Sequence, residues 1–386
     1  MDFDFEKNDK QASYFDNSNE DFLKIKIFGV GGGGCNAVYR LREKVDAGVE
    51  FIASNTDMMA LSKINFHNIK KLQLGKEKTK GMGAGALPEV GKEAARESRD
   101  EIKAMIDGAN MVFVTAGMGG GTGTGGAPIV AGVAKELGIL TIGIVTKPFN
   151  YEGKKKMVIA EEGIEKLKKD VDVLIVVPNE RAFEYAPTGT PLIEVVKMAD
   201  EVLLKSIMGI TDIMLKHSLI NLDFADIRTV IKNKGTAHIG VGRAQGENRV
   251  MDALRKACSS PLLDSNIEGA THIIVSIIAD YELSGNSVEK ALNLIPEVAA
   301  PEANIIHGLG FDENLKDEVV VTVIATGFDG VNDNDVEVKA EEITVTGEKP
   351  SLFSIRKKPQ EKVEKETEEL SQDDIPAFLQ RLKQRG

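Results

Sequence analysis

The chain has 386 residues, 42% of them hydrophobic, and a mean hydropathy of -0.14, which is typical of a globular protein and excludes disorder of the whole chain. At about 150 residues per domain, this length predicts two domains and some additional sequence. The net charge of -12 opposes binding to nucleic acid phosphates. Two cysteines and five scattered histidines indicate a reducing compartment, the cytoplasm, and no structural metal site.

The sequence contains no segment that suggests export or membrane insertion. Residues 1–22 are acidic and polar, so we expect a disordered extension and not a signal peptide. The longest uncharged stretch, 111–134, has eight glycines among its 24 residues, which would break a membrane helix. We therefore expect no direct membrane insertion.

From residue 23 to residue 190, short β-branched runs alternate with helical stretches, which predicts an α/β, Rossmann-like domain with a parallel sheet. The predicted strands are 24–30, 49–55, 69–74, 110–116, 139–146 and 171–177. Residues 191–219 then hold a long helix with apolar residues on one side, which we expect to link two domains.

Residues 220–329 are predicted to form a smaller α+β domain. Its expected helices are 223–234, 248–258 and one that begins at Ser287, and its expected strands are 236–242, 269–279, 303–310 and 318–327. Residues 330–371 are rich in charged residues and poor in large apolar ones, which predicts a flexible linker. Residues 372–386 regain apolar residues and form the predicted tail peptide.

The first chemical motif is the run Gly29 to Gly34, which lies between a predicted strand and a helix. Glycines there let the backbone approach a phosphate, and a helix N-terminus offers free N–H groups. The run also satisfies G-x-G-x-x-G, so a dinucleotide site in an NAD-dependent oxidoreductase is an alternative. Alone, this match is equally compatible with a tight turn.

The second motif, residues 117–128, has seven glycines among its first ten residues, together with Thr122 and Thr124. We interpret this density as a backbone wrapped around an anionic group, with the hydroxyls as further donors. No Lys-Ser or Lys-Thr follows, so it is not a Walker A loop. A third glycine-rich loop, 79–86, also precedes a helix, and three loops at one sheet edge suit a triphosphate.

These loops, with TKPFNYEGKKK, VVPNE and NLDFADIRTV in the same order and spacing, resemble the FtsZ family of bacterial tubulin-like cell-division GTPases. The resemblance implies GTP as substrate, with Mg²⁺ as cofactor, and names the binding residues. The expected phosphate-binding residues are Gly31, Gly32, Gly33, Gly34, Cys35 and Asn36 for the α- and β-phosphates, Gly119, Gly120, Gly121, Thr122, Gly123, Thr124 and Gly125 for the β- and γ-phosphates, and Gly81, Gly83, Ala84 and Gly85 for the γ-phosphate.

By the same resemblance, Glu152 and Lys156 would bind ribose and phosphate, and Asn36, Asn179 and Asp200 would contact guanine. Two positions depart from the family pattern, which has arginine in place of Lys156 and a stacking aromatic in place of Val196. Lysine lacks the planar fork of arginine. The departures imply weaker nucleotide binding with base selectivity retained.

The motif that starts at Asn221 contains Asp223 and Asp226. Taken alone, Asp223 is a good N-cap and Asp226 an acidic residue of the first turn. In the family, this loop completes the active site of the next subunit, which implies that Asn221, Asp223 and Asp226 are catalytic and that the protein forms head-to-tail filaments. The paired aspartates also argue against a nucleotide-binding scaffold without hydrolysis.

The tail places Ile375, Phe378, Leu379 and Leu382 at helical spacing, which predicts a short helix that forms on a partner. The resemblance implies that residues 373–386 bind membrane tethers such as FtsA, at the division site beneath the membrane. The oxidoreductase alternative predicts one glycine fingerprint and an acidic residue about 20 positions later. Instead there are three loops, and Asp57 comes later than that.

Overall fold

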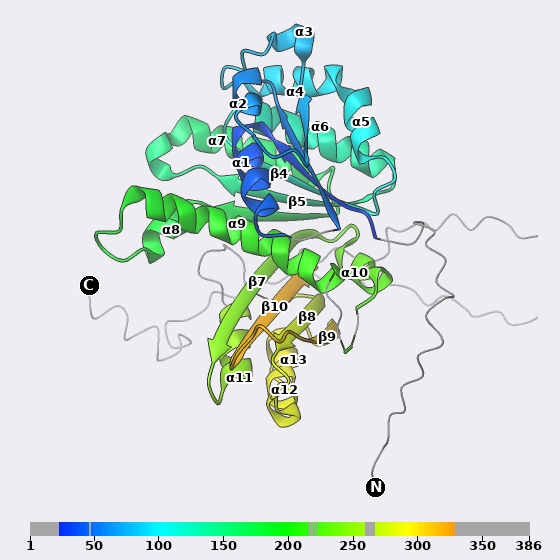
Figure 1. Cartoon of the computed structure of the whole chain (residues 1–386), viewed down its shortest axis with the longest axis vertical. Helices are drawn as coiled ribbons and strands as arrows, with labels where there is room; N and C mark the ends of the chain where they lie inside the picture. Colours follow the sequence, from blue (N-terminus) through cyan, green and yellow to red (C-terminus); the bar gives the residue numbers. More distant parts are fainter. Residues whose placement is uncertain (1–22, 46–47, 216–218, 221, 259–266, 329–386) are drawn as a thin grey trace, which may run out of the picture. The chain divides into compact units, whose positions relative to one another are not determined.

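The computed structural model describes residues 23–45, 48–215, 219–220, 222–258 and 267–328. Within them, ten strands form one sheet in the order β3-β2-β1-β4-β5-β6-β7-β10-β8-β9 (Figure 1). The predictions for residues 1–22, Asn221, the linker 330–371 and the tail 372–386 lie outside the described residues. No helix in the described ranges is long and apolar enough to cross a membrane.

The first six strands are all parallel, which confirms the predicted α/β half with its parallel sheet. They are β1 (Ile25–Val30), β2 (Val49–Asn55), β3 (Ile69–Gln73), β4 (Met111–Gly117), β5 (Leu140–Lys147) and β6 (Val173–Pro178). Three of them, β1, β4 and β5, are almost entirely buried, because helices cover both faces of the sheet.

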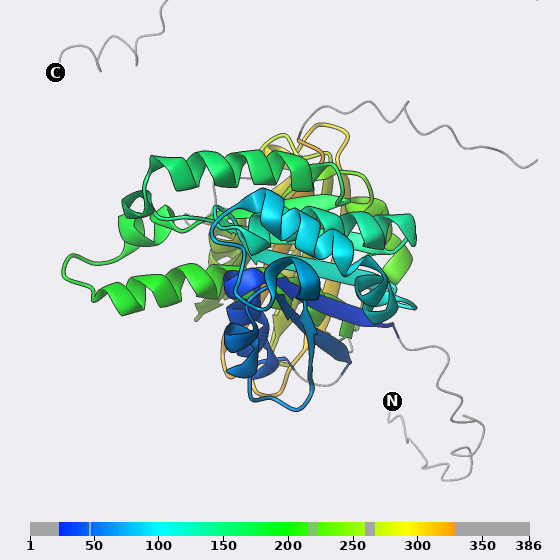
Figure 2. The ribbon, with the colours of Figure 1, turned by 90° about the horizontal axis from the view of Figure 1, so that it is seen from above.

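Two layers of helices enclose this sheet (Figures 1 and 2). On one face, buried side chains from α4 (Pro88–Glu97), α5 (Arg99–Ile106), α6 (Thr122–Glu136) and α7 (Lys154–Lys168) share a hydrophobic cluster with the strands. The other face is covered by α1 (Gly31–Arg42), α2 (Met58–Ser62) and the long helix α9 (Leu192–Leu215). The short elements α3 (Lys76–Thr79), η1 (Asn150–Glu152) and α8 (Glu180–Tyr185) connect these parts.

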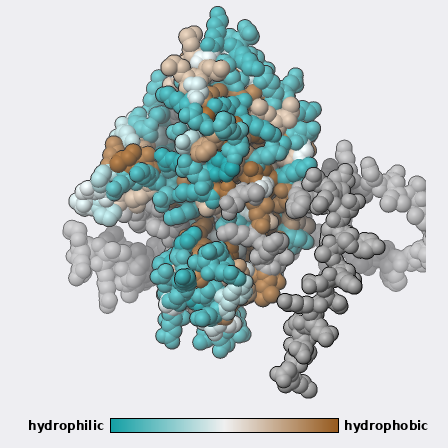
Figure 3. Space-filling view, in the orientation of Figure 1, coloured by the Kyte–Doolittle hydropathy of each residue, from teal (hydrophilic) through white to brown (hydrophobic). Residues whose placement is uncertain are grey.

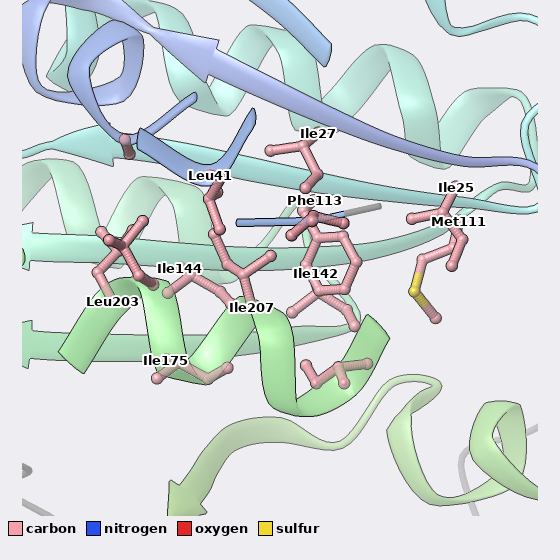
Figure 4. Packing of buried hydrophobic residues seen from close by; sticks show 14 of the residues in the cluster. Ile25, Ile27, Leu41, Met111, Phe113, Ile142, Ile144, Ile175, Leu203 and Ile207 are labelled. Atoms are coloured by element: carbon pink, nitrogen blue, oxygen red, sulfur yellow. The ribbon is translucent and has the colours of Figure 1, made fainter. Parts of the chain in front are cut away.

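The 24-residue helix α9 confirms the long helix expected between residues 191 and 219, and spans about 36 Å. Figure 4 shows Leu203 and Ile207 of α9 among Ile144, Ile175 and Leu41 of the sheet and α1. The same hydrophobic cluster continues into the second half through Ile239, Ile274 and Ile324. The helix therefore packs against both halves.

The second half has the mixed sheet expected of an α+β domain. Its elements are α10 (Phe224–Ile231), β7 (Gly235–Gln245), α11 (Arg249–Cys258), β8 (His272–Ala279), α12 (Gly285–Leu292), α13 (Ile295–Val298), β9 (Asn304–Phe311) and β10 (Glu318–Thr326). Strand β10 is antiparallel to β7 and β8, while β9 is parallel to β8. Two residue pairs, Val173 with Gly235 and Leu174 with Thr236, join β6 to β7 in parallel.

Candidate functional site

The structure brings the three glycine-rich loops together at the carboxyl edge of the parallel sheet. The loops that begin α1 and α6 follow β1 and β4, which are neighbouring strands. The loop 81–85 is tied to the end of β2, because the Gly83 N–H donates to the Thr56 carbonyl (3.2 Å). It also touches the α6 loop, since a Cβ on Gly121 would lie 2.8 Å from the Ala84 Cβ. This convergence is the one predicted for a triphosphate site.

Most glycines in these loops are needed for close packing. A Cβ on Gly34 would lie 2.3 Å from the Thr115 carbonyl oxygen, and one on Gly125 would lie 2.0 Å from the Pro88 carbonyl oxygen. A Cβ on Gly123 would lie 2.7 Å from the Gly117 carbonyl oxygen. The glycine density around α6 therefore comes largely from tight packing of α6 on β4 and α4. Attributing all of it to an anionic ligand was wrong.

A smaller set of glycines faces open space. Apart from adjoining backbone of the same segment, no described atom lies within 4 Å of the Cβ position of Gly32, Gly85 or Gly120. Gly32 is in the first turn of α1 and Gly120 lies two residues before α6, and neither helix has a side chain that caps its N-terminus. The free N–H groups and the positive end of each helix dipole point to the same edge. This arrangement fits the phosphates of a nucleotide.

Side chains within the phosphate loops are largely committed to the protein. The Gly119 N–H donates to the Thr124 hydroxyl (2.9 Å), so Thr124 holds the loop closed. The Cys35 thiol is buried and donates to the Ser54 carbonyl (3.4 Å), and burial raises its pKa to about 12. Of Cys35, only the backbone can face a ligand. Asn36, one residue further, is exposed.

Glu152 and Lys156, the expected ribose and phosphate ligands, lie beside the α6 loop. Lys156 forms an ion pair with Glu152, and its backbone oxygen would lie 2.8 Å from a Cβ on Gly119. Glu152 also accepts from the Phe149 N–H (2.9 Å), which fixes η1 after β5. A cationic ammonium group is thus held next to the phosphate loop.

The candidate guanine-binding residues come from three elements. Asn179 directly follows β6 at the same sheet edge, and Asn36 lies on α1. Asp200 on α9 pairs with Arg40 on α1, a partner that nothing in the sequence indicated. Burial raises the pKa of the Asp200 carboxyl, and Arg40 opposes that rise.

The position that would carry a stacking aromatic in the family is part of the hydrophobic packing in this chain. Val196 packs partly buried against a small cluster that contains Phe149 and Ala182. The Phe149 ring stacks on Tyr151 with centroids 5.2 Å apart and meets Phe183 edge-on at 5.3 Å. The sequence did not predict this group of aromatic rings, because Phe183 is far along the chain from Phe149 and Tyr151.

Asp223 and Asp226 lie at the opposite edge of the parallel sheet. Strand β7 starts at Gly235, which pairs with Val173 at the start of β6, and α10 comes immediately before β7. Figure 1 shows α8 and α10 at the two ends of α9. The Asp223 carboxylate caps α10 by accepting from the Asp226 N–H (2.7 Å). The structure does not bring either aspartate to the glycine loops of its own chain.

A parallel sheet with phosphate loops at its carboxyl edge, a long helix and a mixed second sheet define a nucleotide-binding protein. Residues 24–187 match the Tubulin/FtsZ family, GTPase domain, and residues 235–329 match the FtsZ family, C-terminal domain. The chain belongs to the Tubulin/FtsZ family and is a GTPase that binds GTP.

Solved structures agree with this assignment. The FtsZ dimer of M. jannaschii, described as empty, is 42% identical, with 80% of this chain and 89% of that chain covered and a TM-score of 0.74. A mutant of the same FtsZ is 43% identical, with 79% and 91% covered and a TM-score of 0.73. CetZ2 from Haloferax volcanii, a GTPγS-bound protofilament, shares the fold at 20% identity, with 78% and 92% covered and a TM-score of 0.67. The oxidoreductase alternative finds no support in these matches.

Proposed function

We propose that this GTPase polymerises head to tail, and that the acidic loop of one copy completes the active site of the next. The observation that carries the proposal is the position of the two sets of residues. The glycine loops lie at the carboxyl edge of the sheet, and Asp223 and Asp226 lie at the amino edge. In a head-to-tail stack, these two edges face each other between neighbouring copies.

In this arrangement the phosphates of GTP lie over Gly32 and Gly120, with Lys156 beside them. Asn36, Asn179 and Asp200 recognise guanine, since a carboxylate can accept from its N1–H and exocyclic amine. Asp223, Asp226 and Asn221 of the next copy orient the water that attacks the γ-phosphoryl group in line. The donors of the glycine loops stabilise the charge that develops on the phosphoryl oxygens.

Mg²⁺ is the proposed cofactor, and it would bind mainly through the phosphates of GTP. Mg²⁺ usually keeps several waters and binds through substrate phosphates with one or two carboxylates. Within the described ranges, no cluster of three or more His, Cys, Asp or Glu could hold a metal by itself. The ion would neutralise negative charge on the phosphates of GTP. The phosphate oxygens and waters would be most of its ligands.

Apolar surface at both ends supports association with a second copy. Beside the glycine loops, Met59 and Met82 are 73% and 81% exposed. At the other end, Leu219 is 72% exposed. Ile220 pairs with Leu309 of β9, next to an apolar groove between α12 and β9. Figure 3 shows apolar surface over β9. Such surfaces on opposite ends suit a heterologous, repeating contact.

GTP hydrolysis measured against protein concentration tests the split site. We expect turnover per molecule near zero in dilute solution and a rise above a threshold concentration, because the attacking water is oriented only at an interface. The rival within one chain is Asp57, which adjoins the 81–85 loop but uses its carboxylate to cap α2 through the Ala60 N–H (3.1 Å). Turnover that stays constant on dilution would favour such a base in the same chain and overturn the proposal.

We further propose that the filaments build the cell-division ring, in the cytoplasm beneath the membrane. Residues 23–190, 191–219 and 220–329 would be the GTP-binding domain, linking helix and second domain, and 330–371 the linker to the tail. The apolar stripe within residues 373–386 is the proposed contact for membrane tethers such as FtsA. Deleting 373–386 should abolish tether binding in a pull-down and leave GTP turnover intact.

A further inference from the structure

Thr56 connects two of the glycine loops. It directly follows β2, is fully buried, and its hydroxyl oxygen lies 2.6 Å from the hydroxyl oxygen of Thr122, the first residue of α6. Its carbonyl oxygen accepts from the Gly83 N–H (3.2 Å) and from the Thr79 hydroxyl (3.3 Å). One residue thus bonds to the α6 loop with its side chain and to the 81–85 segment with its backbone.

Thr122 lies where all three loops meet. It is half-buried, two residues after Gly120, whose Cβ position faces open space. A Cβ on Gly31 would lie 3.3 Å from the Thr122 Cβ, so the side chain of Thr122 also borders the α1 loop. Its hydroxyl is therefore next to the place where the phosphates are proposed to bind.

The chemistry of two facing hydroxyls sets the direction of their hydrogen bond. Thr122 is the only side-chain partner of the Thr56 hydroxyl among the described residues. A phosphate oxygen is only an acceptor, so a Thr122 hydroxyl that binds it must donate its proton outward. The Thr122 oxygen is then free to accept from the buried Thr56 hydroxyl, and consecutive bonds of this kind strengthen one another.

We infer that Thr56 is a positioning residue, which orients the Thr122 hydroxyl as a donor to the terminal phosphates of GTP and ties the 81–85 segment to it. The inference rests on the proposed phosphate role of the α6 loop. The inference assigns a role to a residue that does not touch the nucleotide. Through Thr56, the 81–85 segment, which is expected to bind the γ-phosphate, is connected to the α6 loop.

The test is a double-mutant cycle on GTP affinity, measured by titration in dilute solution with the full chain. Thr122→Val should weaken binding roughly tenfold, as expected for loss of a hydrogen bond to a charged group. Thr56→Val should weaken it several-fold, and Thr56→Ser should restore it because serine keeps the hydroxyl. In the Thr122→Val background, Thr56→Val should have no further effect, because Thr56 acts through Thr122.

A matched control is Thr115→Val, the same substitution at the same edge of the sheet. Thr115 is buried on β4, and its hydroxyl has no hydrogen-bond partner in the described structure. GTP affinity should not change in this variant. Thermal unfolding shows whether each variant is folded, and Thr56→Cys, with a weak donor of similar size, replaces Thr56→Val if the latter is unfolded.

Two results would overturn the inference in distinguishable ways. Normal affinity in Thr122→Val would remove the proposed phosphate contact of Thr122, and the relay with it. Weakened binding in Thr122→Val, with normal binding in Thr56→Val or with fully additive losses in the double variant, would leave the phosphate contact and reject Thr56 as its positioning residue.

Discussion

At the scale of single residues, the glycines of the loops fall into two groups. Some pack so tightly that an added methyl group would clash, and others leave room for a ligand. Apart from adjoining backbone of the same segment, Gly120 has no described atom within 4 Å of its Cβ position, and its φ is not in the left-handed region. Gly125, five residues later, has the Pro88 carbonyl oxygen at 2.0 Å. Replacement by alanine should therefore have different effects at Gly120 and at Gly125.

Gly120→Ala should fold with a stability within about 0.5 kcal/mol of the original and bind GTP more weakly, because its methyl occupies the space for phosphate. Gly125→Ala should lose about 1–3 kcal/mol, since α6 must move away from α4. Urea unfolding and GTP titration on both variants measure the two effects. Equal loss of stability in both would contradict the division of the glycines.

The Arg40 and Asp200 pair predicts how guanine binding depends on pH. Burial raises the folded-state pKa of Asp200 above 3.8, so its ionisation opposes folding at neutral pH, and this opposition disappears as the pH falls below 3.8. Guanine recognition needs the ionised carboxylate. Affinity for GTP should therefore fall as the pH drops through the folded-state pKa.

Arg40→Gln removes the charge that opposes this rise in pKa. The loss of GTP affinity on acidification should then begin at a higher pH than in the original protein. Comparing the two proteins with the same nucleotide cancels the ionisation of the phosphates. Superimposable pH profiles would show that Asp200 does not depend on Arg40 or does not contact the base.

At the scale of elements, Asp223 has two roles that substitutions can separate. Its carboxylate caps α10 through the Asp226 N–H, and it is a proposed catalytic group. Asp223→Ser keeps a capping oxygen, so stability should be retained while hydrolysis falls. Asp223→Ala should lose hydrolysis and also about 1 kcal/mol of stability. If Asp223→Ser hydrolysed GTP normally, Asp223 would be only a cap.

The sequence predicted the elements whose signals are long or repeated. Strands β1, β4, β5 and β6 are mainly apolar runs because both faces of the sheet are covered there, and α9 is long enough to show helical periodicity. The helices α2, α3, α8 and α13 have only four to six residues, which is too short for such a pattern. The sheet order, with β4 beside β1, depends on contacts that no local pattern specifies.

For the site, the sequence predicted the loops and their meeting point, but not how side chains pair within them. Arg40 and Asp200 are 160 positions apart, and Thr56 and Thr122 are 66 apart, so neither contact leaves a local signal. The packing role of Gly125 was equally hidden, since glycine for close approach and glycine for a phosphate look the same in a sequence.

At the scale of the whole molecule, two inactive variants should restore each other. Asp226→Ala keeps its own nucleotide pocket, and Gly120→Arg keeps its acidic loop while filling the phosphate space. Gly120 suits this test better than Gly121, which packs against Ala84 and Leu87. A mixture should regain phosphate release where an intact acidic loop meets a filled pocket.

Phosphate release from each variant alone and from the mixture checks this, with co-sedimentation of tagged chains to show that both enter the same filaments. Mixed filaments without any gain in release would reject action of Asp226 on a neighbouring chain.

The hydrophobic cluster around α9 has a consequence for how the molecule unfolds. It joins Phe113 and Ile142 of the parallel sheet to Ile239 and Ile324 of the mixed sheet, so neither sheet has a complete core without the helix between them. Melting one sheet would expose the apolar surface of the other. We therefore expect calorimetry to show a single heat-absorption peak, with van't Hoff and calorimetric enthalpies in agreement. Two separable peaks would mean that α9 unfolds with one sheet only.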